Sequence, residues 1–265
     1  PLDFQSAVEL MKTGLSQALI YFYPLPGRLA TSSDGVVYID CNDSGADFIE
    51  ASAPDLRLEQ VLTENVGAVV GELFALMNEA VNMDGHFLPL LVIQVTKLRD
   101  GTAVGFTVNH SVVDETSLWH FINSWAQLCR KPSLSIDIMP LHTRHFGAPL
   151  PIELNLQGIL DKICPSPLKE RIFHFTKETI SQLKQQANQG SCKDTTISSF
   201  QALCAHIWQA ITRSRRLSPT ETTSFKLAIN FRPRVVPPFP YSYFGNAIQE
   251  VSSTVTTHMS FWKMT

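Results

Sequence analysis

A histidine and an aspartate four residues apart, His110 and Asp114, are the side chains of this sequence best suited to acid–base chemistry. His110 follows a run rich in Val, Thr and Phe and precedes a segment with helical spacing, so we expect it between a strand end and a helix start. The positive end of a helix dipole disfavours a second positive charge and so favours a neutral imidazole. Such an imidazole can take a proton from a hydroxyl or amine as that group attacks an electrophile.

This pair also has a simpler interpretation, because a His and an Asp four residues apart occur often by chance. In that interpretation His110 is an ordinary loop histidine and Asp114 is a carboxylate that caps the following helix. The surrounding sequence has to decide between the two.

Other chemically active side chains give weaker signals. His142 and His145 have a spacing that suggests a metal, but they lie in a Pro-rich stretch without Cys or acidic partners, which favours surface histidines and no metal. We expect structural roles for His120 and His206, and core positions for Trp119, Trp125 and Trp208. The chain has no Gly-x-Ser-x-Gly, phosphate loop or dinucleotide fingerprint.

Composition excludes several classes of function. A net charge of −3 does not favour a nucleic-acid partner, and the run from Arg213 to Arg216 fits the end of a helix. No apolar run reaches the roughly 20 residues of a membrane span. The five cysteines have no regular spacing, which predicts reduced thiols and a cytoplasmic protein.

The elements that position His110 are the clearest in the chain. We expect two strands, at residues 90–98 and 102–109. Arg99-Asp100-Gly101 joins them, and its Asp-Gly is a strong signal for a hairpin turn. A helix should follow over residues 116–130, with Thr116 as its N-cap.

The remaining pattern predicts an α/β fold with mixed sheets and flanking helices. We expect helices at 6–22, 67–81, 177–189 and 195–213, and strands at 36–41, 171–175 and 225–231. The Pro-rich residues after 131 suggest a crossover, which gives a first lobe at 1–140, a crossover loop at 141–170 and the start of a second lobe at 171–265.

Five segments in order then resemble one family. Phe106-Thr-Val-Asn-His110-Ser-Val-Val-Asp114 is similar to the HxxxD region of the plant BAHD acyltransferases. The other four segments begin at Tyr23, Asp43, Ile197 and Asn230, and the last includes Tyr243-Phe-Gly-Asn246. Members of this family move an acyl group from coenzyme A to an alcohol or amine. The resemblance implies a two-lobed fold like that of chloramphenicol acetyltransferase.

The resemblance also implies roles for individual residues. His110 would be the base in a ternary complex. Asp114 would have a structural role and pair with an arginine, with Arg232 as the preferred partner and Arg234 as the second choice. Ser198 and Ser199 would lie near the pantetheine arm, although helix capping explains them equally well. Acyl-CoA would be a co-substrate, with no permanently bound cofactor, no metal and no membrane partner, and the protein would be a monomer.

Two departures from the family pattern leave alternatives open. Glu115 replaces the usual Gly after the motif aspartate, and the family's Asp-Phe-Gly-Trp-Gly motif is absent. We therefore expect a chain truncated at its C-terminus and also at its N-terminus, which would be unstable or inactive alone because its second sheet would have unpaired edges. A non-catalytic or degenerate relative is the main alternative, and a hydrolase using the same site ranks below it.

Overall fold

A computed structural model describes residues 3–61, 71–75, 80–131, 135–143, 172–189, 196–218 and 220–256 of the 265-residue chain. The chain forms two compact units. The first consists of Pro1–Ile172 with Asn230–Ala247, and the second of Phe173–Ile229 with Ile248–Thr265. The lobe boundaries at 140 and 171 remain predictions, and Asn230–Ala247 packs with the first unit although it follows most of the second.

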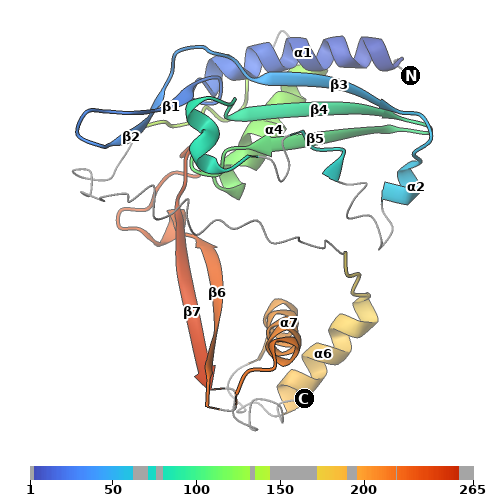
Figure 1. Cartoon of the computed structure of the whole chain (residues 1–265), viewed down its shortest axis with the longest axis vertical. Coiled ribbons are helices and arrows are strands. Elements are labelled where there is room, and N and C mark those ends of the chain that lie inside the picture. The colour runs from blue at the N-terminus through green and yellow to red at the C-terminus, as the bar shows by residue number, and fades with distance from the viewer. Residues whose placement is uncertain are drawn as a thin grey trace. The chain divides into compact units, whose positions relative to one another are not determined.

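The first unit contains a mixed three-stranded sheet in the order β3-β4-β5 (Figure 1). Strand β4 (Leu91–Leu98) pairs antiparallel with β5 (Thr102–Val108) and parallel with β3 (Asp47–Ala53). The predicted hairpin and mixed α/β class are confirmed. Strand β3 was not predicted, because most of its side chains are exposed or half-buried and it lacks an apolar run.

A second sheet in this unit is a short antiparallel hairpin. Strand β2 (Val37–Asp40) was predicted, and it pairs with β1 (Arg28–Thr31), which was not. A four-residue strand is too short to show an alternating pattern of its own. A 3-10 helix, η1 (Asn82–His86), contacts β1, and a short helix α2 (Leu58–Val61) follows β3.

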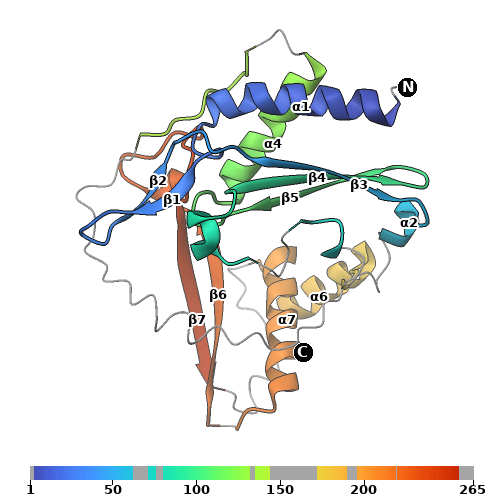
Figure 2. The same cartoon turned by 45° about the horizontal axis from the view of Figure 1, so that its top comes forward.

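Two helices cover one side of the three-stranded sheet (Figure 2). These are α1 (Phe4–Tyr21) and α4 (Glu115–Arg130), and they pack against each other as well. Both were predicted from their apolar periodicity. No helix in the described part of the chain is long and apolar enough to cross a bilayer.

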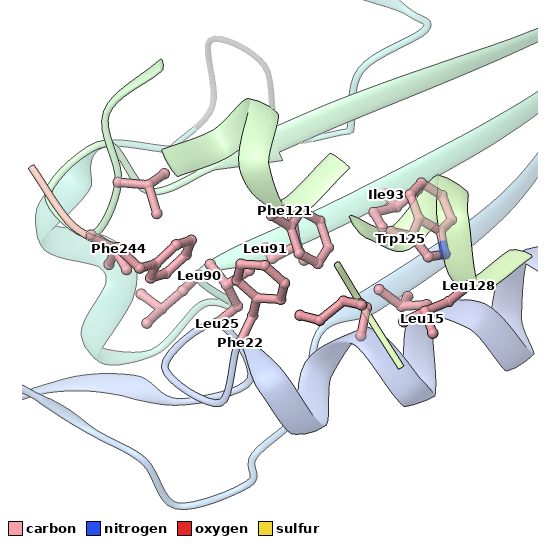
Figure 3. Close-up of a cluster of buried hydrophobic side chains, with 14 of the residues drawn as sticks. Leu15, Phe22, Leu25, Leu90, Leu91, Ile93, Phe121, Trp125, Leu128 and Phe244 are labelled. Atoms are coloured by element: carbon pink, nitrogen blue, oxygen red, sulfur yellow. The ribbon is translucent and has the colours of Figure 1, made fainter. Parts of the chain in front are cut away.

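The core lies between these helices and β4, where Phe22 packs edge-on against Phe121 and Phe244 (Figure 3). Trp125 is buried and donates from Nε1 to the carbonyl of Met11. Trp119, predicted to be core, is 53% exposed, so that prediction was wrong. It precedes the buried pair His120 and Phe121 on α4 and faces away from the core.

The second unit is built from α6 (Lys177–Gln189), α7 (Ser199–Arg215), and paired strands β6 (Thr222–Asn230) and β7 (Ile248–Thr256). Three of these four elements were predicted, and β7 was not. The strand predicted at 171–175 is wrong for its described residues, because Ile172–Phe175 form no strand.

Three other predictions fall wholly or partly outside the described residues. Of the predicted helix at 67–81, only 71–75 and 80–81 are described. The first range has one helical residue followed by turns and a bend, and the second is not helical. Most of the crossover loop and His145 also lie outside.

Candidate active site

His110 lies on an exposed turn between β5 and α4, as its sequence position predicted. The turn is closed by Val112, whose N–H donates to the carbonyl of Asn109 at 3.0 Å. The Asn109 side chain accepts hydrogen bonds from both the N–H and the hydroxyl of Ser111. The strand therefore ends in a locally bonded turn that presents the imidazole to solvent.

Two side chains from distant segments hold the backbone of His110. The His110 N–H donates to Oδ1 of Asn82 at 3.1 Å, and the His110 carbonyl accepts from Nδ2 of Asn246 at 2.8 Å. Asn82 begins η1, and Asn246 belongs to the segment Asn230–Ala247, which lies between the two parts of the second unit in sequence but packs in the first. Both backbone polar groups of His110 are thus fixed from outside its own turn.

Asp114 is the N-cap of α4. Its Oδ1 accepts from the Ser117 N–H at 2.9 Å, so the cap predicted at Thr116 was wrong by two residues. A carboxylate accepts the free N–H groups of the first turn and also favours the positive end of the helix dipole, which explains why Asp114 takes this place. The helix-capping interpretation of Asp114 therefore holds.

Asp114 also forms a buried ion pair with Arg232, at the start of a second 3-10 helix, η2 (Arg232–Arg234). The guanidinium donates to both carboxylate oxygens, at 2.7 and 2.9 Å, and both side chains are 2% exposed. The contact expected between these two residues is present. Arg234, the second choice, is exposed and donates to the carbonyl of Asn230 instead.

The electrostatic setting of Asp114 follows from these contacts. Burial alone would raise the pKa of this carboxyl. Hydrogen bonds from Arg232 and from the Ala247 and Ser117 N–H groups, with the charge of Arg232, reverse that effect and hold the pKa below its ordinary value. Asp114 is therefore an ionised carboxylate near neutral pH.

Ser117, for which the sequence predicted no role, links the same network. Its buried hydroxyl donates to the Gly245 carbonyl at 2.9 Å and accepts from the Gly245 N–H and from Arg232. Arg232 also donates to the carbonyls of Tyr243 and Gly245. The segment of Tyr243–Ala247 is thus bound to the start of α4. The only sequence signal was that Ser117 occupies the third position of the helix.

Ser198 and Ser199 belong to the second unit. Ser198 is the N-cap of α7: its hydroxyl accepts from the Gln201 N–H at 3.2 Å, and the Gln201 side chain accepts from the Ser198 N–H at 2.9 Å. Ser199 begins the helix. The capping role is present, and a role in coenzyme binding stays a prediction.

Three other histidines of the described residues make structural contacts. His120 bonds the Ile138 carbonyl, and His86 bonds the Thr31 hydroxyl and the Met83 carbonyl. His142 bonds the Tyr21 carbonyl and packs against Tyr23 and Phe244. Within the described ranges, no three His, Cys, Asp or Glu side chains gather as a metal site would require.

Comparison with known proteins shows the family of the chain. The model of the Transferase family matches residues 1–260. The chain is 37% identical to the BAHD acyltransferase DCR of Arabidopsis thaliana and 34% identical to hydroxycinnamoyltransferase 1 of Oryza sativa subsp. japonica. These matches cover 95% and 91% of the chain, but only 56% and 58% of the relatives.

The solved structure of vinorine synthase has the same fold, with a TM-score of 0.71 and 26% identity over 97% of this chain and 60% of that one. Fungal TRI101 from F. sporotrichioides, at 19% identity, shares the fold with a TM-score of 0.67. By its sequence match and its fold, this chain belongs to the Transferase family of BAHD acyltransferases.

Proposed function

We propose that the protein transfers an acyl group from acyl-CoA to a hydroxyl or amine of a small molecule, with His110 as general base in a ternary complex. The observation that carries this proposal is the position of His110, exposed on a turn whose backbone is held by Asn82 and Asn246. An exposed imidazole on a fixed backbone can reach an acceptor and take its proton as it attacks the thioester carbonyl.

The geometry of Asp114 supports a structural role for that residue. Its Oδ1 accepts from Ser117 and Arg232, and its Oδ2 accepts from Arg232 and Ala247. A carboxylate offers about four acceptor positions, so these four bonds leave none for an imidazole. Asp114 therefore braces the start of α4 and does not orient His110 as the acid of a serine-protease triad does.

The names of relatives and neighbours support coenzyme A as the donor. A 34% identical protein of Avena sativa is a hydroxycinnamoyl-CoA:5-hydroxyanthranilate N-hydroxycinnamoyltransferase, and the TRI101 structure contains coenzyme A. Because this chain spans less than two thirds of the length of such relatives, the activity proposed is that of the whole protein.

We expect a cytoplasmic monomer, in keeping with the free thiols of Cys41, Cys129 and Cys204.

The test is acyl-CoA turnover by the full-length protein against a panel of alcohols and amines. Release of free CoA that requires an acceptor, with formation of the ester or amide, supports transfer. Release without an acceptor indicates a hydrolase, and no turnover with any donor indicates a non-catalytic relative.

Glu115, the departure from the family pattern, is exposed in the first turn of α4, so we do not expect it to prevent folding of the site.

The backbone support of His110 gives a first prediction. Asn246→Ala removes the donor to the His110 carbonyl, and we expect kcat to fall roughly 5-fold with little change in the KM for acyl-CoA, because a typical hydrogen bond contributes about 1 kcal/mol. Asn82→Ala should act similarly, and Asn82→Asp, which keeps an acceptor for the His110 N–H, should recover part of the loss. Equal losses in Asn82→Ala and Asn82→Asp, or an unchanged kcat in all three variants, would contradict the positioning role.

The two serines give a second prediction. Ser198→Ala should destabilise the protein by about 1 kcal/mol, since the N-cap of α7 is lost, while Ser199→Ala should leave the unfolding midpoint nearly unchanged. If either hydroxyl contacts the pantetheine arm, its removal raises the KM for acyl-CoA but not that for the acceptor. Unchanged KM values for acyl-CoA in both variants would leave Ser198 with its capping role alone.

A further inference from the structure

A cluster of three arginines lies at the end of α7 and has no part in the proposed mechanism. Arg213 and Arg215 belong to the last turn of this helix, Arg216 is its C-cap, and all three are exposed. The helix dipole favours cations at this end, and the run ends the helix as its sequence predicted. The cluster has a second property, because an exposed serine, Ser218, follows it after one further residue.

Ser218 lies outside the helix, in the loop that connects α7 to β6. Its hydroxyl is 3.1 Å from the hydroxyl of Thr220, which is also exposed. Its N–H donates to the carboxylate of Glu221. The side chain is therefore at the surface, where an enzyme can reach the hydroxyl without opening the core.

Ser214 also has arginines beside it, but its structural setting is different. It lies within α7, and its hydroxyl donates to the Ala210 carbonyl at 2.9 Å. Among the six residues before it only Arg213 is basic, whereas the three arginines of the cluster precede Ser218 by five, three and two positions. Ser218 therefore combines a loop position with a basic segment on its N-terminal side, and Ser214 does not.

The last turn of α7 is held weakly enough to open. Arg216 has a left-handed backbone, with φ 51° and ψ 42°, which is unfavourable for a residue that carries a Cβ. Its N–H donates to the Arg213 carbonyl at 3.2 Å, and helix ends of this kind open at little cost in free energy. Residues 213–218 can thus become extended while the preceding residue stays packed, since the Thr212 hydroxyl lies 3.3 Å from that of Thr223 on β6.

We propose that Ser218 is a phosphorylation site for an arginine-directed serine kinase. Such a kinase binds its substrate in an acidic groove, and the three arginines supply the complementary charge. The kinase transfers the γ-phosphoryl group of ATP to Oγ of Ser218: the P–O bond to ADP breaks, a P–O bond to Oγ forms, ADP leaves, and the hydroxyl proton passes to solvent. Thr220 is exposed too, but the third residue before it is Leu217. This inference does not depend on acyl transfer.

A phosphate at this position would change the charge of the loop. A phosphoserine carries about −1.5 to −2 charges at pH 7, and its oxygens accept strong hydrogen bonds from arginine. It would also stand beside Glu221, whose carboxylate accepts from the Ser218 N–H, and two negative groups at one turn repel each other. Phosphorylation therefore reduces the positive charge of the helix end and weakens the turn that leads into β6.

The experiment incubates the full-length protein with Mg-ATP and protein kinase B, which selects arginines five and three residues before its acceptor, and locates phosphate by peptide mass spectrometry. We expect phosphate at Ser218. Ser218→Ala should lose it, Ser218→Thr should recover it, and Ser214→Ala should leave it unchanged. Phosphate only at other residues, or no phosphate at all, would overturn the inference.

Arginine variants show whether the cluster is what the kinase recognises. Arg215→Ala and Arg213→Ala should each lower kcat/KM of the kinase roughly 10-fold, whereas Arg234→Ala, at another exposed arginine, should leave it unchanged. Equal rates for the three variants would contradict the recognition. Because Pro219 follows Ser218, a mitogen-activated protein kinase, which selects proline after its acceptor, is the second probe. Modification of Ser218 by that kinase alone would overturn the assigned kinase class.

Discussion

His110→Ala is expected to lower kcat for acyl transfer by about 10²–10⁴-fold, the usual contribution of a general base. The KM for acyl-CoA and the unfolding midpoint should change little, because the His110 side chain is exposed and its structural contacts are made by its backbone. The measurement is steady-state kinetics of the full-length protein with a saturating acceptor, beside a thermal unfolding curve.

Two further variants sharpen this test. His110→Gln keeps a polar side chain that can hydrogen-bond but cannot accept the proton, so it should be as inactive as His110→Ala. His174→Ala removes another exposed histidine and should leave the rate unchanged. Activity of His110→Ala within a few-fold of the parent protein would rule out His110 as the base.

Arg232→Ala should produce the largest loss of stability. It leaves Asp114 buried and ionised without its partner, which typically costs about 3–5 kcal/mol, and it also removes the donors to Tyr243 and Gly245. Arg234→Ala is the matched control, because that exposed arginine contacts only a backbone carbonyl among its described partners, and it should change the stability by less than about 1 kcal/mol. Urea unfolding midpoints of the two variants measure the difference. Similar midpoints would contradict the assigned role of the pair.

The same pair predicts how stability depends on pH. The pKa of Asp114 is lower in the folded protein than in the unfolded chain, so its stabilising contribution is complete above the unfolded value of about 3.9 and is lost as the pH falls through the folded value. As the pH is lowered below about 4, the urea midpoint of the parent protein should therefore decrease, because the stabilising contribution of Asp114 is lost. Asp114→Asn should lack this part of the acid dependence, although it is less stable at neutral pH. An identical acid dependence in both proteins would refute the prediction.

The sequence predicted the elements around His110 well because they carry strong local signals. Asp-Gly in a turn fixes the hairpin of β4 and β5, and apolar residues at helical spacing fix α1 and α4. Strands β1, β3 and β7 were missed, since they are short or mostly exposed and their pairing depends on distant partners. The wrong N-cap at Thr116 has a related cause, because either residue fits a cap and the Arg232 contact favours Asp114.

The candidate site could be predicted only in part. The pairing of Asp114 with Arg232 came from family resemblance, since 118 residues separate the two in sequence. Asn246 was named only within a segment that carried the family resemblance, and no role was predicted for Asn82, Ser117 or Asn246. An Asn or Ser gives no periodic signal, and each acts here through a hydrogen bond to a distant segment. Such contacts depend on the tertiary fold and cannot be read from local spacing.

The central claim, direct transfer assisted by His110, is tested most directly by a single-turnover experiment with the full-length protein and acyl-CoA. Without an acceptor, we predict no release of free CoA and no acyl adduct in the intact mass of the protein. With an acceptor, CoA and the acylated product should appear together at the same rate, and His110→Ala should slow both. A covalent acyl-protein, or CoA release that does not depend on the acceptor, would contradict the account.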